Sequence, residues 1–420
     1  MSVYARRKFL QFLAASPLYS LASGQSPSAP AASPVLATAP DPGAKSALRL
    51  IASPDLALSV FDFEAVARNN MPPAHFGYIA TGVDDDRTLH ANHEAFNHLQ
   101  LRPRRLVDVS HIDTSVELFG VTWPQPLFLC PCGSQHAFHP EGELATARAG
   151  KTRKTLQVLS TVATESVENV MQEAWTPIWQ QLYPTTSWKI TEAIVRRAEK
   201  AGCPVLVITI DLPAGRNTET LSRFSATDTR KCTACHVSQN GEAHGFSPRK
   251  PSFDGLDTSQ AHMDNPAFTW DSVRQVRAMT SMKIVIKGLQ TAEDAKLAVE
   301  HGIDGIIVSN HGGRAEETGR ATIECLPEVI DAVRRTNASP MPVMLDGGIR
   351  RGTDIFKALA LGASAVGIGR PYLWGLGAFG QPGVERVLDI LHREFSLSMQ
   401  QCGVRSLREI TPAYVVRPSA

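Results

Sequence analysis

The 420-residue chain has no excess of charge of either sign, with 42 lysines and arginines against 41 aspartates and glutamates. Surfaces that bind nucleic acids are strongly basic, so this balance gives no reason to expect a nucleic acid partner. Cysteine is also scarce, and seven residues are too few for a disulfide scaffold at this length. Hydrophobic residues make up 43% of the chain, which is enough for one large buried core.

The N-terminal apolar run is too short to cross a bilayer as a permanent helix. It follows directly on Arg6-Arg7, an arrangement typical of a twin-arginine export signal over residues 1–24. The alternative is an amphipathic helix that begins at the arginine pair. We expect a periplasmic protein, either free or associated with the membrane. Residues 25–57 are rich in Ala, Pro and Ser and predict a flexible linker.

Short apolar segments alternate with helical patterns from about residue 96 onward. The segments that read as buried parallel strands are 127–129, 156–159, 178–182, 205–210, 284–286, 306–308, 343–345 and 365–368. Helical patterns cover 142–154, 191–201, 292–301, 326–335 and 353–361. This alternation predicts a single (β/α)8 TIM barrel within residues 58–420, with an N-terminal helical extension. Residues 224–267, after the fourth strand, are polar and without periodicity, which predicts a long lid loop.

The ends of four predicted strands carry the residues that suggest chemistry. One strand ends in Lys287 and the next in Ser309-Asn310-His311-Gly312-Gly313-Arg314. The last two strands are followed by Asp346-Gly347-Gly348-Ile349-Arg350 and Gly369-Arg370. Glycine-rich turns with arginine suit a phosphate, and barrels commonly bind phosphate after their last two strands.

These motifs together resemble the FMN-dependent L-2-hydroxy-acid oxidase and dehydrogenase family, of the glycolate oxidase, lactate oxidase and mandelate dehydrogenase type. The likeness runs from about residue 60 to the C-terminus, with matching motifs at 139–143, 181–183, 309–314, 346–354, 356–363 and 402–407. It implies an enzyme with FMN as cofactor that oxidises a small L-2-hydroxy acid to the 2-oxo acid. The electrons would pass to O2 or to a periplasmic or membrane carrier, and a homotetramer is the common assembly.

The resemblance also assigns roles at the substrate. His311 corresponds to the base that takes a proton from the substrate, Asp211 orients it, and Tyr183 lies beside the reacting hydroxyl. Arg314 and Tyr78 correspond to groups that bind the substrate carboxylate. A second arginine for that carboxylate would be Arg216, although the turn before it is shorter than is usual in the family. Where glycolate oxidase has a tryptophan near the substrate side chain, this chain has Val162, which suggests a roomier pocket.

The same comparison assigns a cofactor site. Lys287 would lie near the flavin pyrimidine edge and stabilise negative charge there. Gly133 would lie under the flavin, where its identity resembles dehydrogenase members more than oxygen-using ones. The remaining flavin and phosphate contacts implied are Ser160, Gln181, Thr209, Ser309, Asp346, Gly348, Arg350, Gly369 and Arg370. Alternatives outside this reaction are an isomerase-type FMN barrel and a non-catalytic flavin or haem electron-transfer module.

Cys232, Cys235 and His236 form a C-x-x-C-H motif within the predicted lid loop. In an exported protein this spacing is compatible with covalent haem c, with His236 as the axial ligand. The alternatives are a disulfide or free cysteine pair, and a zinc site that uses His236 and His244. No cytochrome-like domain surrounds the motif. Another departure from the family is Ala315-Glu316-Glu317, which replaces a familiar Gln-Leu-Asp after Arg314.

Overall fold

The computed structural model describes residues 50–230, 250–336 and 341–417. The predicted export signal and the C-x-x-C-H motif lie outside these residues. At the end of the expected linker, Pro54–Leu56 form a short 3-10 helix, and the side chains of Ile51 and Ala57 are buried. Packing against the barrel therefore begins several residues earlier than the composition indicates.

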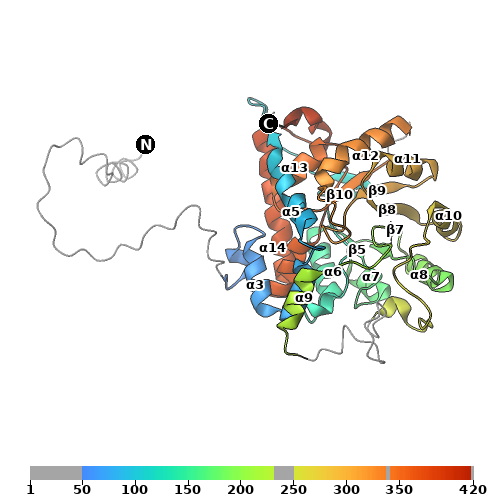
Figure 1. Cartoon of the computed structure of the whole chain (residues 1–420). Helices are drawn as coiled ribbons and strands as arrows, with labels where there is room; N and C mark the ends of the chain where they lie inside the picture. Colours follow the sequence, from blue (N-terminus) through green and yellow to red (C-terminus); the bar gives the residue numbers. More distant parts are fainter. Residues whose placement is uncertain (1–49, 231–249, 337–340, 418–420) are drawn as a thin grey trace, which may run out of the picture. The chain divides into compact units, whose positions relative to one another are not determined.

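Eight parallel strands close into a barrel at the centre of the fold, with the helices outside it (Figure 1). They are β4 (Leu127–Leu129), β5 (Leu156–Leu159), β6 (Trp179–Leu182), β7 (Val205–Thr209), β8 (Lys283–Leu289), β9 (Gly305–Val308), β10 (Val343–Asp346) and β11 (Val366–Ile368). The predicted (β/α)8 fold is thus confirmed. The ring closes where β11 pairs with β4, with Val366 opposite Leu127 and Ile368 opposite Leu129.

Strand residues alternate between two hydrophobic clusters. In β7, Val205 and Val207 belong to the cluster inside the barrel, whereas Leu206 and Ile208 pack in the larger cluster under the helices. Both faces are buried, which explains why the strands are apolar runs without a polar face. An antiparallel hairpin of β2 (Val116–Leu118) and β3 (Val121–Trp123) adds Leu118 and Trp123 to the inner cluster. The barrel is therefore filled with side chains rather than hollow.

The helices after the strands form the outer layer. They are α6 (Gly142–Arg153), α7 (Val167–Glu173), α8 (Trp188–Lys200), α10 (Trp270–Ala278), α11 (Ala292–Glu300), α12 (Thr322–Thr336) and α13 (Gly352–Ala360). The last element of the layer, α14 (Arg370–Cys402), is interrupted at Gly380, whose φ of 66° and ψ of −143° are not helical. Two of these helices begin on a polar cap, because Ser166 and Thr291 accept hydrogen bonds from backbone N–H groups in the first turn.

The N-terminal extension consists of α3 (Asp62–Asn70), α4 (Pro73–Ala80) and α5 (Arg87–Glu94). Helix α3 packs along α14, and α4 packs against α9 (Glu219–Ala226). Helix α9 corrects the start of the lid loop predicted at 224–267, because regular structure continues to Ala226; residues 231–249 of that loop lie outside the described ranges. The helix forms because Phe224 packs edge to face on Phe76, a contact between segments far apart in sequence. Within the described ranges, no helix has the length and apolarity needed to cross a membrane.

Candidate active site

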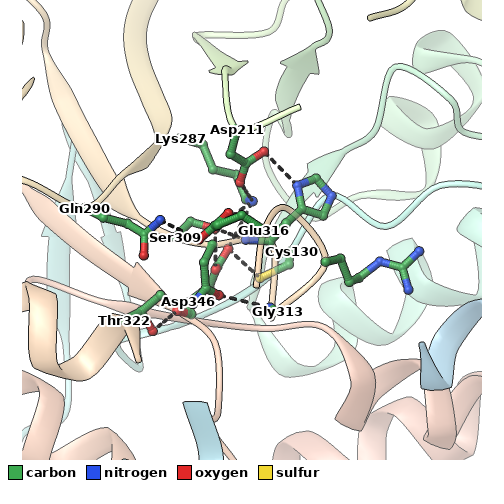
Figure 2. Close-up of polar contacts among 12 residues, drawn as sticks. Cys130, Asp211, Lys287, Gln290, Ser309, Gly313, Glu316, Thr322 and Asp346 are labelled. Carbon is green, nitrogen blue, oxygen red and sulfur yellow. Dashed lines mark hydrogen bonds and ion pairs between the residues drawn. The ribbon is translucent and has the colours of Figure 1, made fainter. Parts of the chain in front are cut away.

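A cavity lies at the carboxyl ends of the strands, where barrels of this kind carry their active sites. The predicted site residues that line it are Tyr78, Gly133, Ser160, Val162, Tyr183, Lys287, His311, Arg314, Asp346, Gly348, Arg350, Gly369 and Arg370. Five others do not line it, namely Gln181, Thr209, Asp211, Arg216 and Ser309. Asp211 accepts a hydrogen bond from the lining residue His311, and Ser309 accepts one from the lining residue Lys287; Figure 2 shows the network to which these contacts belong.

His311 lies between two polar partners. Its Nδ1 donates to Asp211 Oδ1 at 2.9 Å, and its Nε2 accepts from the Tyr183 hydroxyl at 3.2 Å. The backbone of His311 has a φ of 59°, a conformation that is uncommon for residues other than glycine and is often found at functional sites. Burial lowers the pKa of His311 and outweighs the attraction of Asp211. The imidazole is therefore neutral at neutral pH, with Nε2 facing the cavity as a base.

Lys287 is the centre of a buried ionic network beneath the cavity (Figure 2). Its Nζ lies 3.5 Å from Asp346 Oδ2 and 3.9 Å from Asp211 Oδ2, and it donates to Ser309 Oγ at 2.9 Å. Ser309 Oγ in turn donates to Asp346 Oδ1 at 2.6 Å. Burial favours the neutral amine, but the two carboxylates outweigh it and raise the pKa of Lys287. The site thus holds a fixed positive charge next to its base.

Arg314 is held by the helix that carries Tyr78. Its Nη1 donates to the carbonyls of Tyr78 and Thr81, and its guanidinium lies over the Tyr78 ring, 4.6 Å from the centroid. Arg216 behaves differently from the expectation, because its Nη1 donates to the Arg314 carbonyl at 3.1 Å and it does not line the cavity. We attribute this to the short turn after Asp211, which leaves Arg216 supporting the Arg314 backbone.

The end of the cavity that is lined by Arg350 and Arg370 is suited to bind an anion. Arg370 donates from all three guanidinium nitrogens to the carbonyls of Ile79, Gly312 and Thr81, and Arg350 lies over the Trp374 ring at 4.9 Å. Burial lowers the pKa of Arg350 to about 10 and that of Arg370 to about 9. Neither arginine forms an ion pair with a carboxylate in the described part of the chain. Helix α14 begins at Arg370. This end of the cavity therefore presents two guanidinium groups and the backbone N–H groups of a helix N-terminus, which together suit a phosphate.

Close packing of glycine turns keeps this end of the cavity in shape. Gly348 has a φ of 83°, and a Cβ built on it would lie 1.9 Å from the carbonyl oxygen of Asn92. The Asn92 side chain exchanges hydrogen bonds with Asn310 at 2.8 and 3.0 Å. This asparagine pair could not be predicted, because its members are far apart along the chain. It connects α5 to the loop that carries His311.

Two buried polar atoms at the carboxyl ends of neighbouring strands lack hydrogen-bond partners in the described structure. They are Gln181 Nε2 at the end of β6 and Thr209 Oγ1 at the end of β7. Gln181 Oε1 is already used by Ser160 Oγ and the N–H of Thr161. Unsatisfied buried polar groups are rare in proteins and suggest a missing ligand or water. The residues present therefore fit FMN: Lys287, Arg350 and Arg370 line the cavity, and the unpartnered atoms of Gln181 and Thr209 lie at the ends of two neighbouring strands of the barrel.

Several residues of the site were not predicted or were interpreted differently. Cys130 lines the cavity with Cys132, and its Sγ lies 3.7 Å from Asp346 Oδ2. The loop that departs from the family also has a role, because the Glu317 carboxylate accepts from the backbone N–H groups of Arg87 and Thr88. Glu317 thereby caps α5 from a distant part of the chain.

Comparisons with known proteins agree with this site. The family model described as FMN-dependent dehydrogenase matches residues 67–417. Glycolate oxidase 3 of Oryza sativa subsp. indica is 40% identical over 368 residues, which cover 87% of this chain and 98% of that protein. A peroxisomal (S)-2-hydroxyacid oxidase of Arabidopsis thaliana is 37% identical over 361 residues, covering 86% of this chain and 97% of its own length.

Solved structures agree in fold as well. A flavocytochrome b2 variant with pyruvate bound has a TM-score of 0.76 and 32% identity, and the match covers 86% of this chain and 87% of that one. A mandelate oxidase variant has a TM-score of 0.73 and 34% identity, with 87% and 100% covered. The chain therefore belongs to the FMN-dependent dehydrogenase family.

Proposed function

We propose that this FMN-dependent (S)-2-hydroxy-acid oxidoreductase acts on an acid with a side chain larger than that of glycolate. The observation that carries the reaction is the arrangement of His311, whose Nε2 faces the cavity while Asp211 accepts from Nδ1 at 2.9 Å. The larger side chain is supported by Val162, which lines the cavity at the position of a glycolate oxidase tryptophan. Bound FMN supplies the two-electron oxidant for the conversion to the 2-oxo acid.

His311 begins as a neutral base and takes one proton from the substrate at Nε2. The imidazolium that results is stabilised by the adjacent Asp211 carboxylate, which is itself kept ionised by His311 and Lys287 against the effect of burial. Burial raises the pKa of Tyr183 well above its ordinary value. The phenol therefore stays protonated and can donate a hydrogen bond to the substrate oxygen as negative charge develops on it.

Arg314 has donors to spare for the substrate carboxylate. Nη1 is engaged by two backbone carbonyls, whereas Nε and Nη2 make no hydrogen bond within the described residues. A guanidinium held on one side in this way presents a pre-oriented two-point fork. This orients the substrate with its carbinol towards His311 and Tyr183.

The test is anaerobic addition of glycolate, L-lactate, L-2-hydroxyoctanoate and L-mandelate to the FMN-loaded protein, followed by the flavin absorbance. We expect bleaching by an L-acid larger than glycolate, no bleaching by the D-enantiomer, and loss of bleaching in His311→Gln with FMN still bound. Flavin that no acid bleaches would overturn the hydroxy-acid reaction and favour an isomerase-type activity. Full function in His311→Gln would favour a non-catalytic electron-transfer module.

The proposal extends to the electron acceptor and the location. A carrier rather than O2 is favoured by Gly133, whose identity resembles dehydrogenase members of the family more than oxygen-using ones, and the Arg6-Arg7 pattern of an export signal favours a periplasmic location. Reoxidation of the reduced protein should be faster with a one-electron dye than with air. Fractionation of cells that express the wild type and an Arg6→Lys, Arg7→Lys variant tests export, and the visible spectrum of the periplasmic protein tests haem at Cys232 and Cys235.

A further inference from the structure

Lys250 is a buried lysine that the proposed reaction does not use. Its side chain is 5% exposed, although it lies in the connection between β7 and α10, just before a short 3-10 helix at Pro251–Phe253. The Nζ atom donates to Ser134 Oγ at 2.5 Å and to the carbonyl of Val162 at 2.7 Å. Burying an ammonium group is unfavourable unless its donors are satisfied, so the contacts define a specific position for this side chain.

The two acceptors belong to loops that already touch each other. Ser134 follows β4, has a φ of 60°, and donates its N–H to the Val162 carbonyl at 3.0 Å. Gly133 packs so closely on Val162 that a Cβ at residue 133 would lie 2.8 Å from that same carbonyl oxygen. The Val162 carbonyl therefore accepts one hydrogen bond from the neighbouring loop and a second, charge-assisted one from Lys250.

Gly133 and Val162 both line the cavity that holds His311 and Tyr183. They form one wall of it, and the hydrogen bonds of Lys250 lie behind this wall. Hydrogen bonds from an ammonium group are about twice as strong as neutral ones. Lys250 thus connects the loop of Ser134 and the loop of Val162 through hydrogen bonds from a third segment. The hydrogen bond between Ser134 and Val162 alone would hold the two loops together less firmly.

We propose that Lys250 is a positioning residue that fixes the wall formed by Gly133 and Val162, and so sets the discrimination between short and bulky 2-hydroxy acids. The inference rests on the proposed function. A wall displaced by a fraction of an ångström changes the fit of the substrate side chain, while the groups that bind the carboxylate and remove the proton lie on other loops. Recognition of the side chain should therefore change more than the chemistry common to all substrates.

The experiment compares the wild type with Lys250→Met, which keeps the length of the side chain without its donors, and with Lys250→Arg, which keeps donors. Lys296→Met is the control, because Lys296 is exposed on α11 and, among the described residues, pairs only with Glu300 on the same helix. For each FMN-loaded protein, kcat and KM are measured with L-lactate and L-mandelate. We expect Lys250→Met to change the ratio of the two kcat/KM values about tenfold, mainly through KM. Lys250→Arg should return the ratio to within about threefold of the wild type.

A purely structural role would lower kcat/KM for both acids by the same factor, and that result would overturn the proposal, as would a ratio unchanged in Lys250→Met. If Lys250→Met does not fold or bind FMN, Ser134→Ala removes one acceptor and leaves the lysine in place. It should change the ratio in the same direction by about threefold, and an unchanged ratio would again overturn the proposal. A wild type that oxidises neither these acids nor any other would instead refute the proposed function.

Discussion

Replacing Asp211 by asparagine tests the electrostatic part of the site most directly. The carboxylate is 3% exposed at the side chain and accepts from His311 Nδ1 at 2.9 Å. Asparagine keeps an oxygen that can accept the same hydrogen bond, so the geometry should be retained while the negative charge is lost. At about 4 Å between charge centres and an effective dielectric constant of about 20, the attraction between the carboxylate and the imidazolium amounts to about 4 kcal/mol.

This energy matters only when His311 carries a proton, that is, as the reaction proceeds. We therefore expect flavin reduction in Asp211→Asn to be slower by about 10³-fold. The pKa of His311 should fall further, since Asp211 is the main group that raises it. Raising the pH should accordingly not restore the rate. Folding should be affected much less, because Lys287 keeps Asp346 at 3.5 Å and is not left unpaired.

The assay is single-turnover reduction of the bound flavin under anaerobic conditions at saturating substrate, with FMN content measured for every sample. Asp108→Asn is the control, because Asp108 is exposed and bonds only to Ser110 among the described residues. A decrease smaller than about tenfold in Asp211→Asn, with FMN fully bound, would refute the view that this carboxylate stabilises the imidazolium. A decrease that high pH reverses would refute it as well.

Three further predictions concern the base, the ring site and the glycine turn. Because burial keeps the pKa of His311 below its ordinary 6.5, flavin reduction should be on its plateau at pH 7 and decline only as the pH falls below about 6.5; a plateau reached only above pH 8 would contradict this. Thr209→Val removes a hydroxyl that has no partner among the described residues, so the Tm of the FMN-free protein should not fall while the Kd for FMN rises about fivefold, and an unchanged Kd would place the ring elsewhere. Gly348→Ala should reduce the unfolding free energy by about 4 kcal/mol in urea titrations, because clash and backbone strain add. Gly120→Ala should cost only about 1 kcal/mol, because its φ is also positive but open space surrounds it; equal losses in the two variants would show that the contact with Asn92 is unimportant.

The barrel could be predicted because each strand is a local apolar run between polar turns. Residues 127–129 and 156–159 were predicted with the bounds that β4 and β5 have. Local sequence also predicts one cavity for His311, Lys287 and Arg314. Each of them follows a strand, and the parallel strands of a barrel have their carboxyl ends on one side.

Elements that depend on distant partners could not be predicted in this way. Helix α9 has only about two turns, which is too short for a clear amphipathic pattern in the sequence. Its apolar side is buried by the contact of Phe224 with Phe76, a residue far away in the sequence. The contact of Arg216 with the Arg314 carbonyl and that of Lys250 with Ser134 likewise join segments remote in sequence. Cys130 belongs to the buried cluster inside the barrel and also lines the cavity. Its apolar neighbours in the sequence do not distinguish a core position from a cavity wall.

The pairing of β4 with β11 has a consequence for how the protein folds during its synthesis. The first strand of the ring finds its second neighbour only when the last strand has been made, so this contact spans almost the entire barrel sequence. Until then β4 is a bare apolar edge, the kind of surface that promotes aggregation of nascent chains. The anion end of the cavity, with Gly369 and Arg370 directly after β11, is also completed at that moment. We therefore expect FMN to be bound only after β11 has been made.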